Sequence, residues 1–457
     1  MSLPARRNTR GAGAVRRGEP PAKLKLYPYP TGTSARVVSR RQVSVGSYVL
    51  LGLASGGYFL YMFSWFSLAA FLSPVVEDLG LSSTQAGIVT GAVPLSYVPM
   101  SLLSGLAIDR LGSRRSLGAG LLVVGTAQLM RGFTTEFTTL LLPTLLLGVG
   151  GTAVTFGLPK LVSELFPPER SGTMSSVYMV GATLGSATVF AVARPLVGPL
   201  VGGWRPFFRY TGVIVVGFAL VWFVVSWSLR NRTARYAERS DDQTFSLGSA
   251  RRDLVSVFTH QGLLLLVVVG TMRLFVTHGL SNWLPTILEA RGMVPALAGT
   301  VTSLFVLVRV LGIVGVPVLS DRFSTRRLPI VGCGVAGAVG LLGLIAGGGI
   351  PTLTVSLVLI GTFMIGGLSP LIRAIPIEMS GIGPRLTAVA TGLIFTVGEV
   401  GGFMGPFVIG ALRDLTGAFA PSLGALVVAS LVTAVAGYRM DEPADSSPSD
   451  TPVDPAG

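Results

Sequence analysis

The sequence predicts an all-α membrane protein in which twelve transmembrane helices form two pseudo-symmetric bundles of six. Three observations lead to this fold class. Half of the 457 residues are hydrophobic and only 12% are charged, the mean hydropathy is +0.68, and a set of landmark residues recurs in the same order at offsets of 211 to 215 residues. A soluble domain of this composition would expose too much apolar surface. The single cysteine, Cys333, excludes a disulfide framework and a cysteine metal site.

Twelve apolar stretches are each long enough to cross a hydrocarbon core of about 30 Å. They cover residues 47–74, 84–107, 116–133, 137–161, 173–196, 207–229, 262–288, 295–319, 328–348, 351–375, 386–411 and 417–438. The joins at 133/137 and 348/351 are short, so counts of eleven or ten remain alternatives. Twelve fits the distribution of charge best.

The basic residues set the predicted orientation, because Arg and Lys near span ends resist translocation. Ten of the first 41 residues are basic and one is acidic, and further arginines gather in alternate loops. We therefore expect both termini to be cytoplasmic in a multi-pass protein of the cell membrane. The net charge of +14 then reflects topology and attraction to anionic membrane lipids, not nucleic-acid binding.

Polar segments divide the chain into five parts. We predict a disordered basic cytoplasmic tail at 1–46, an N-terminal bundle at 47–229, a cytoplasmic linker at 230–261, a C-terminal bundle at 262–438 and a disordered acidic tail at 439–457. The two bundles share ordered landmarks, which indicates an internal duplication.

The clearest landmark is the pattern D-R-x-x-x-R-R, in "IDRLGSRR" and again in "SDRFSTRR". Each copy lies where a span, the second or the eighth, leaves the membrane. The aspartate can pair with the arginines or accept hydrogen bonds from a helix N-terminus, which suggests a conformational latch. A plain turn with positive-inside charge is the alternative. The residues of the predicted latch are Gly105, Asp109, Arg110, Gly112, Arg114, Arg115, Asp321, Arg322, Arg326 and Arg327.

The segment "GLAIDRLGSRR" resembles the loop signature of the major facilitator superfamily, as do "LVSELFPPERSG" after the fourth span and "GWR" before the sixth. The resemblance implies two bundles around a central cavity, transport by alternating access, and a latch that stabilises one closed conformation. "LSNWLPTILEARG" in the seventh span, with "LPKLVSELFPPERSG" after the fourth, is similar to the cyanate and nitroimidazole permeases. Arg309 resembles one of the two facing arginines of the small-anion porters for nitrate and nitrite, whereas its repeat mate here is Tyr97. The fourth span has Thr144 where many proton-driven antiporters of the superfamily have arginine, and the fifth-span antiporter signature is broken at Phe190. A drug/proton exchanger is therefore disfavoured.

Charges within the spans are the best evidence for a functional site, since each costs about 2.5–3.5 kcal/mol on insertion scales. Arg273, Arg309 and Glu399 each lie 12 to 14 residues from a cytoplasmic landmark, which at 1.5 Å per residue is roughly 18–21 Å. All three are therefore predicted near mid-membrane. Arg194 lies closer to the outer face.

We predict that Arg273 and Arg309 bind a substrate anion, because a guanidinium stays charged when desolvated and makes paired hydrogen bonds with oxyanions. Arg194 is a further candidate. Glu399 is the candidate for proton coupling, although it could instead form a static ion pair with one arginine.

Other candidates lie on the first and seventh spans. His278 could also titrate, or pack as a hydrogen-bonded core residue. Tyr58, Tyr61 and Trp65 could line the cavity and stack on a planar substrate, or simply contact neighbouring helices.

The predicted function is secondary active transport of a small organic or inorganic anion, as a symporter driven by protons. An efflux pump for amphipathic compounds is the alternative, and a non-transporting membrane sensor or scaffold is a third hypothesis from another class. No nucleotide loop, metal cluster or nucleophile–base set is present in the sequence, so we expect neither an enzyme nor a cofactor or metal. The partners expected are the small-molecule substrate and membrane lipids, and we expect a monomer.

Overall fold

The computed structural model describes residues 43–231, 233, 260–379 and 384–440. All regular secondary structure in this part of the chain is helical. The predicted tails lie outside the described residues except at 43–46 and 439–440, and so does most of the predicted linker.

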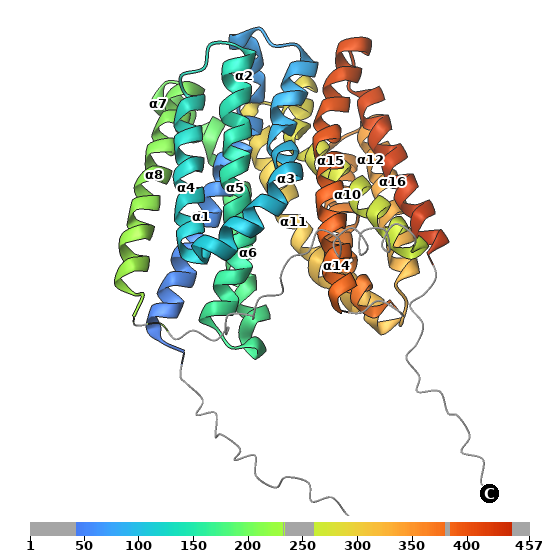
Figure 1. Cartoon of the computed structure of the whole chain (residues 1–457). Helices are drawn as coiled ribbons and strands as arrows, with labels where there is room; N and C mark the ends of the chain where they lie inside the picture. The colour runs from blue at the N-terminus through green and yellow to red at the C-terminus, as the bar shows by residue number, and fades with distance from the viewer. Residues whose placement is uncertain (1–42, 232, 234–259, 380–383, 441–457) are drawn as a thin grey trace, which may run out of the picture. The chain divides into compact units, whose positions relative to one another are not determined.

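The helices of the first half occupy the predicted places of spans one to six (Figure 1). They are α1 (Val45–Ala70), α2 (Leu72–Leu79), α3 (Ser83–Leu111), α4 (Ser113–Arg131), α5 (Phe137–Leu165), α6 (Pro168–Val192), η1 (Ala193–Val197), α7 (Gly198–Val201) and α8 (Trp204–Ser228). Here η marks a π-helical segment.

The helices of the second half occupy the places of spans seven to twelve (Figure 1). They are α10 (Gln261–Ala290), α11 (Pro295–Arg322), α12 (Arg327–Ala346), α13 (Ile350–Leu359), η2 (Ile360–Gly367), α14 (Leu368–Glu378), α15 (Pro384–Thr416) and α16 (Ala420–Arg439). The tenth predicted span is thus built from three consecutive helical segments.

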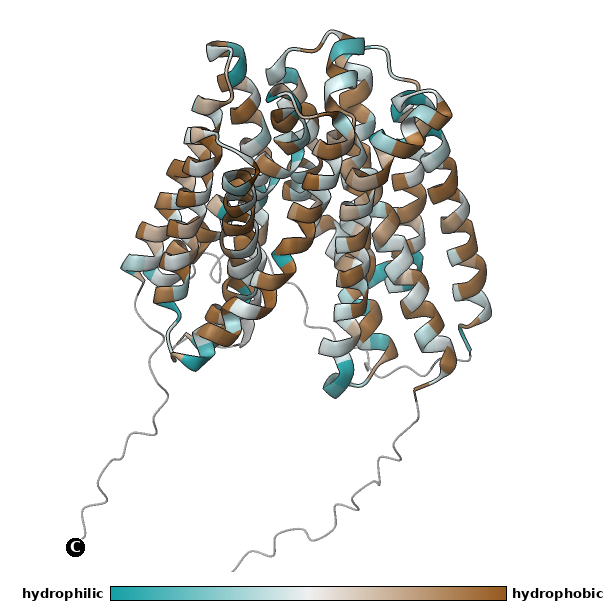
Figure 2. Cartoon of the chain, turned by 180° about the vertical axis from the view of Figure 1, so that it is seen from behind, coloured by the Kyte–Doolittle hydropathy of each residue, from teal (hydrophilic) through white to brown (hydrophobic). Residues whose placement is uncertain are grey.

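Ten helices of the described part are long and apolar enough to cross a membrane, and α3 makes eleven if its two bent pieces are counted together. The predicted third span, α4, is helical but is not among them. Arg114, Arg115 and Gln128 lower its hydropathy. In Figure 2 apolar residues run along the helices, whereas many of the most hydrophilic residues lie near helix ends.

Local sequence explains several helix boundaries. Ser82 caps α3, because its hydroxyl accepts from the Gln85 amide at 3.1 Å while the Gln85 side chain accepts from the Ser82 amide at 3.0 Å. Gly80 ends α2 with φ +60°, and Gly112 joins α3 to α4 with φ +85°. Both angles favour glycine. Helix α3 bends by 63° between Ser101 and Leu103, shortly after Pro99, whose ring removes a helical hydrogen bond.

Corresponding helices pack alike in the two halves. Helix α6 packs on α1, and α15 packs on α10 in the same way. A Cβ atom on Gly185 would lie 2.2 Å from the Phe59 carbonyl oxygen, and one on Gly405 would lie 2.1 Å from the Phe275 carbonyl oxygen. Glycine at these positions therefore permits close contact between the packed helices.

The halves contact each other through symmetry-related helix pairs. Helix α3 of the first half packs on α15, and α11 of the second half packs on α6. Glycines again permit these contacts, since a Cβ atom on Gly87 would lie 2.4 Å from the Pro406 carbonyl oxygen and one on Gly299 would lie 2.4 Å from that of Phe190. These contacts bring the candidate side chains of α1, α10, α11 and α15 together.

Candidate functional site

Helix α10 contributes Arg273 and His278 to a buried polar cluster. Both residues are more than nine-tenths buried. Arg273 Nε and His278 Nδ1 have no hydrogen-bond partner among the described residues. A buried arginine carries a large desolvation cost, so its surroundings must supply compensating charge or a ligand.

Arg309 of α11 faces the same region. Its Nη2 atom donates a hydrogen bond of 2.8 Å to Ser281 Oγ of α10, and its guanidinium lies 4.7 Å above the ring of Phe305. Its Nε atom is buried and unpartnered within the described chain. The hydrogen bond and the aromatic ring hold the guanidinium plane in place and leave one edge open.

Glu399 of α15 supplies the carboxyl group of the cluster. Its Oε2 atom lies 3.8 Å from His278 Nε2, beyond hydrogen-bond distance, and its side chain is 14% exposed. A Cβ atom on Gly402 would lie 2.9 Å from Oε2 and 3.0 Å from Pro94 of α3, so the carboxyl group sits where α3, α10 and α15 meet. The charges of Arg273 and Glu399 are close enough to interact, as are those of Arg273 and Arg309. The structure therefore brings all three predicted mid-membrane charges together.

The first half contributes aromatic side chains to this cluster. The ring of Trp65 stacks on that of His278, with centroids 5.3 Å apart and planes within 9°. Tyr61 lies beside Trp65 and Tyr58 stacks on Tyr61, with centroid separations of 5.7 Å and 6.2 Å. The three predicted aromatic residues are buried together, and Trp65 makes direct contact with the second half.

Two residues that the sequence did not lead us to predict, Tyr97 and Thr155, lie beside the three aromatic side chains. We call the group of Tyr58, Tyr61, Trp65, Tyr97 and Thr155 the aromatic wall. The hydroxyl of Tyr97 lies 2.8 Å from that of Tyr61 and 2.8 Å from that of Thr155. The internal repeat could have identified Tyr97, because Tyr97 precedes Arg309 by 212 residues, the offset that relates the two copies of the D-R-x-x-x-R-R pattern.

Arg194 lies elsewhere. It belongs to η1 and forms an ion pair with Glu289 near the end of α10. Ser73 of α2 donates a second hydrogen bond to Glu289, at 2.7 Å. These contacts join the halves at the helix ends opposite to Val45 and Arg439, and the structure does not bring Arg194 into the central cluster.

A second contact joins the halves at these same ends. The carboxylate of Asp414, near the end of α15, accepts hydrogen bonds from the backbone amides of Ser83 and Thr84 at 2.9 Å and 2.7 Å, and from the Thr84 hydroxyl at 2.6 Å. A carboxylate at a helix N-terminus is stabilised by the unpaired amides and by the helix dipole.

Among the predicted latch residues of the second half, Arg326 joins two carboxylates in an ion-pair network. Arg326 bonds to Asp321 at 2.5 Å and to Glu378 at 2.6 Å. Hydrogen bonds to Glu378 and Asp321 raise the pKa of Arg326. Arg327 lies over the ring of Tyr438 at 4.3 Å, and Arg322 is exposed.

The first half pairs its latch residues differently. Asp109 forms an ion pair with Lys160 of α5, while Arg114 donates to the Thr233 hydroxyl at 2.6 Å and reaches the Ser226 carbonyl at 3.4 Å. Arg110 and Arg115 are exposed. A Cβ atom on Gly105 or Gly112 would meet no atom within 4 Å, so the positive φ is what favours glycine at Gly112. These ion pairs and hydrogen bonds of the two latch copies each join residues of the same half.

Arg131 is a buried charge that the sequence reasoning missed. It is the last residue of α4 and is completely buried. Its guanidinium donates to the Thr144 hydroxyl at 3.0 Å, to the Ser64 carbonyl at 3.1 Å and to Gln128 Oε1 at 3.2 Å. Arg131 therefore supplies a guanidinium next to Thr144, the residue that stands in the fourth span where related antiporters have arginine.

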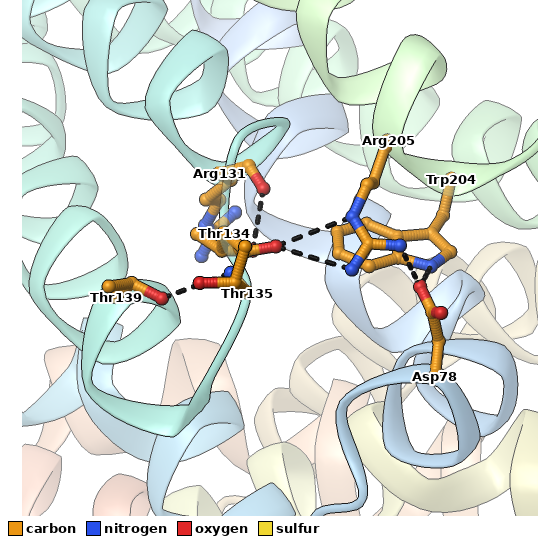
Figure 3. A network of polar contacts seen from close by, with 7 residues as sticks. All are labelled: Asp78, Arg131, Thr134, Thr135, Thr139, Trp204 and Arg205. Atoms are coloured by element: carbon orange, nitrogen blue, oxygen red, sulfur yellow. Dashed lines mark hydrogen bonds and ion pairs between the residues drawn. The ribbon is translucent and has the colours of Figure 1, made fainter.

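Figure 3 shows the loop that follows Arg131. The Thr134 hydroxyl donates to the Arg131 carbonyl at 2.9 Å, and Arg205 donates to the Thr134 carbonyl at 3.3 Å. Arg205 is also paired with Asp78, which accepts from the Trp204 indole at 3.0 Å. This network ties the ends of α2, α4 and α8 together.

Within the described residues, no group of three or more His, Cys, Asp or Glu side chains is placed to hold a metal ion. Cys333 is buried and unpaired with any other cysteine. The central cluster can therefore act through its charges, its hydrogen-bonding atoms and its aromatic rings.

Comparison with known proteins identifies the family. Residues 54–406 match the Major Facilitator Superfamily. The chain is 26% identical to the uncharacterized transporter YycB of Bacillus subtilis over 81% of this chain and 88% of that protein. It is 27% identical to a putative tartrate transporter of Agrobacterium vitis over 79% of this chain and 86% of that protein.

Among solved structures, a bacterial homolog of the human lysosomal transporter Spinster, in an inward-facing and unoccupied conformation, shares the fold. Its TM-score is 0.69 at 16% identity, with 86% of this chain and 96% of that chain covered. The family match, the helical architecture and the apolar spans together lead to one conclusion: the chain belongs to the major facilitator superfamily and is a multi-pass membrane transporter.

Proposed function

We propose that this transporter moves a small organic anion by proton-coupled symport. The observation that carries the proposal is the pair of arginines: Arg273 and Arg309 lie together, and each has a buried Nε atom without a partner in the described chain. An oxyanion placed between them would pair with both guanidinium groups. The relative named a putative tartrate transporter supports an organic acid as the substrate.

Glu399 is the proposed proton carrier. It is the acidic group of the cluster, its Oε2 atom lies 3.8 Å from His278 Nε2, and that oxygen has no hydrogen-bond partner among the described residues. An anion that enters beside Arg273 changes the charge next to Glu399, so binding of the anion and of a proton are coupled. His278, whose Nε2 lies 3.8 Å from Glu399 Oε2 and whose ring stacks on Trp65, would respond to the same change.

Proteoliposome uptake and exchange with small organic acids, with and without an imposed pH gradient, test this proposal. Arg309→Gln should weaken anion binding at least about 30-fold, since removing one partner of a buried charge contact costs about 2 kcal/mol or more. Glu399→Gln should preserve exchange of anion across the membrane but abolish accumulation driven by the pH gradient.

Arg209→Gln is the matched control, because Arg209 is a half-buried arginine that lies over Phe133 at 5.3 Å, outside the cluster. It should transport like the parent protein. Binding that survives Arg309→Gln, or gradient-driven accumulation that survives Glu399→Gln, would contradict the roles proposed for these residues. Loss of folding in both variants would instead favour a static ion-pair network.

A further inference from the structure

The central cluster offers both donors and an acceptor to a ligand. Five of its buried side-chain atoms have no hydrogen-bond partner among the described residues: Trp65 Nε1, Arg273 Nε, His278 Nδ1, Arg309 Nε and Glu399 Oε2. The indole and the two guanidinium nitrogens can only donate, the carboxyl oxygen accepts, and His278 Nδ1 donates or accepts according to the tautomer of the imidazole. A buried polar atom without a partner is unfavourable, so a ligand that pairs with these atoms gains that energy on binding.

The neutral hydroxyl groups of the aromatic wall are already engaged. Tyr61, Tyr97 and Thr155 lie in a chain with successive oxygen separations of 2.8 Å. Each of these hydroxyl groups already has a hydrogen-bond partner, so none of them needs a ligand to pair with it. Among the buried atoms without a partner, the acceptors are Glu399 Oε2 and, when the imidazole carries its proton on Nε2, His278 Nδ1, and only Glu399 Oε2 belongs to an acidic group.

A simple oxyanion would fit only part of this arrangement. Its oxygens would pair with the arginine and indole donors, but it would bring no donor to Glu399 Oε2. That oxygen would remain unpaired, because His278 Nε2 at 3.8 Å is too distant for a hydrogen bond. An anion that also carries a hydroxyl group would satisfy both sides of the cluster.

We infer that the substrate is a hydroxy acid whose carboxylate binds Arg273 and Arg309 and whose hydroxyl group donates to Glu399 Oε2. The inference rests on the proposed function, since it concerns the same site. A carboxyl group keeps an acceptor oxygen when it is protonated, so the contact is compatible with both proton states of Glu399. Trp65, whose ring stacks on that of His278, adds its Nε1 as a donor from the first half.

Competition during counterflow in proteoliposomes tests this inference. Succinate, malate and tartrate share one dicarboxylate skeleton and carry no, one and two hydroxyl groups, and propionate and lactate form a second matched pair. Each hydroxy acid should compete at a concentration at least about tenfold lower than its parent acid, because a site that hydrogen-bonds a hydroxyl rejects the analogue without it.

Variants of Glu399 test whether this residue causes the preference for hydroxy acids over their parent acids. Glu399→Met removes the acceptor and should bring the hydroxy and parent acids to equal potency, whereas Glu399→Gln keeps an acceptor oxygen and should retain most of the preference. Glu77→Gln, at an exposed acid of α2, is the control and should behave like the parent protein. Because glutamine preserves the size of the side chain, the Glu399→Gln variant also shows whether a lost preference in Glu399→Met arises from misfolding.

The outcomes separate the two proposals. Equal competition by hydroxy and parent acids in the parent protein would overturn the hydroxy-acid inference while leaving anion transport intact. A preference that persists in a folded Glu399→Met variant would overturn the assignment of the hydroxyl to Glu399. Failure of every acid to exchange or compete would overturn the proposed function, and the inference with it.

Discussion

At the scale of single residues, arginines of the same type have different roles because of what surrounds them. Arg309 is held by one hydroxyl and one aromatic ring and keeps an unpaired edge. Arg194 has a carboxylate partner. Arg131 is completely buried: its Nε and Nη1 atoms donate to neutral oxygens of α1, α4 and α5, while Nη2 has no partner among the described residues. We infer that Arg131 is a structural clamp that fixes α1 beside Tyr61 and Trp65.

Substituting Arg131→Lys tests this clamp. A lysine keeps the charge but cannot reach Thr144, Ser64 and Gln128 with a planar fork. Each hydrogen bond to a charged group contributes about 1.5–3 kcal/mol, so the loss of at least one should lower the free energy of unfolding by that order. The midpoint of thermal unfolding in detergent measures the change. Arg209→Lys, which replaces a half-buried arginine of α8, should shift this midpoint little, and equal shifts in the two variants would argue against a clamp.

At the scale of single elements, the start of α3 combines a local and a distant cap. The local cap is the reciprocal pair of hydrogen bonds between Ser82 and Gln85, which the chain makes within one turn. The distant cap is Asp414, which approaches from α15 of the other half and takes the amides of Ser83 and Thr84. The local cap holds the helix in any conformation, whereas the distant cap exists only while the halves meet at this end.

Asp414→Asn should therefore weaken closure at this end without unfolding α3. Asp414 is exposed, so the lost contact is worth at most about 1 kcal/mol, or roughly a fivefold change in the balance of open and closed states. A cysteine at Thr90, a buried position on α3, reports the change in a background where Cys333 is replaced by serine. Its labelling by a soluble maleimide should become up to about fivefold faster. Unchanged labelling would show that Asp414 does not hold the closed state.

At the scale of the whole molecule, the polar contacts between the halves concentrate at one set of helix ends. Arg194–Glu289, Ser73–Glu289 and the Asp414 cap all lie at the ends opposite to Val45 and Arg439. The latch residues at the other ends bond within their own half. Alternating access in a two-bundle transporter requires the first set of contacts to break while others form.

Cross-linking tests whether these ends must separate. With cysteines at Arg194 and Glu289 in the background without Cys333, a short bismaleimide should join the halves and abolish uptake, while ligand binding persists. Each single-cysteine variant treated with the same reagent is the control and should keep its uptake. Full uptake by the cross-linked protein would mean that the halves do not part at this end during transport.

The sequence by itself determined the all-helical class and the places of the helices long enough to cross a membrane, and it selected Arg273, Arg309 and Glu399, which the structure brings together. Hydropathy, charge and an internal repeat can be read directly from the order of residues, so they do not require a tertiary structure. The charge partners were decided only by tertiary structure: Glu289 for Arg194, Lys160 for Asp109, and neutral oxygens for Arg131. A span that is apolar on every side does not show in its sequence which face turns toward the other helices. The partner of each charged side chain therefore depends on how the packed helices are rotated and how they cross.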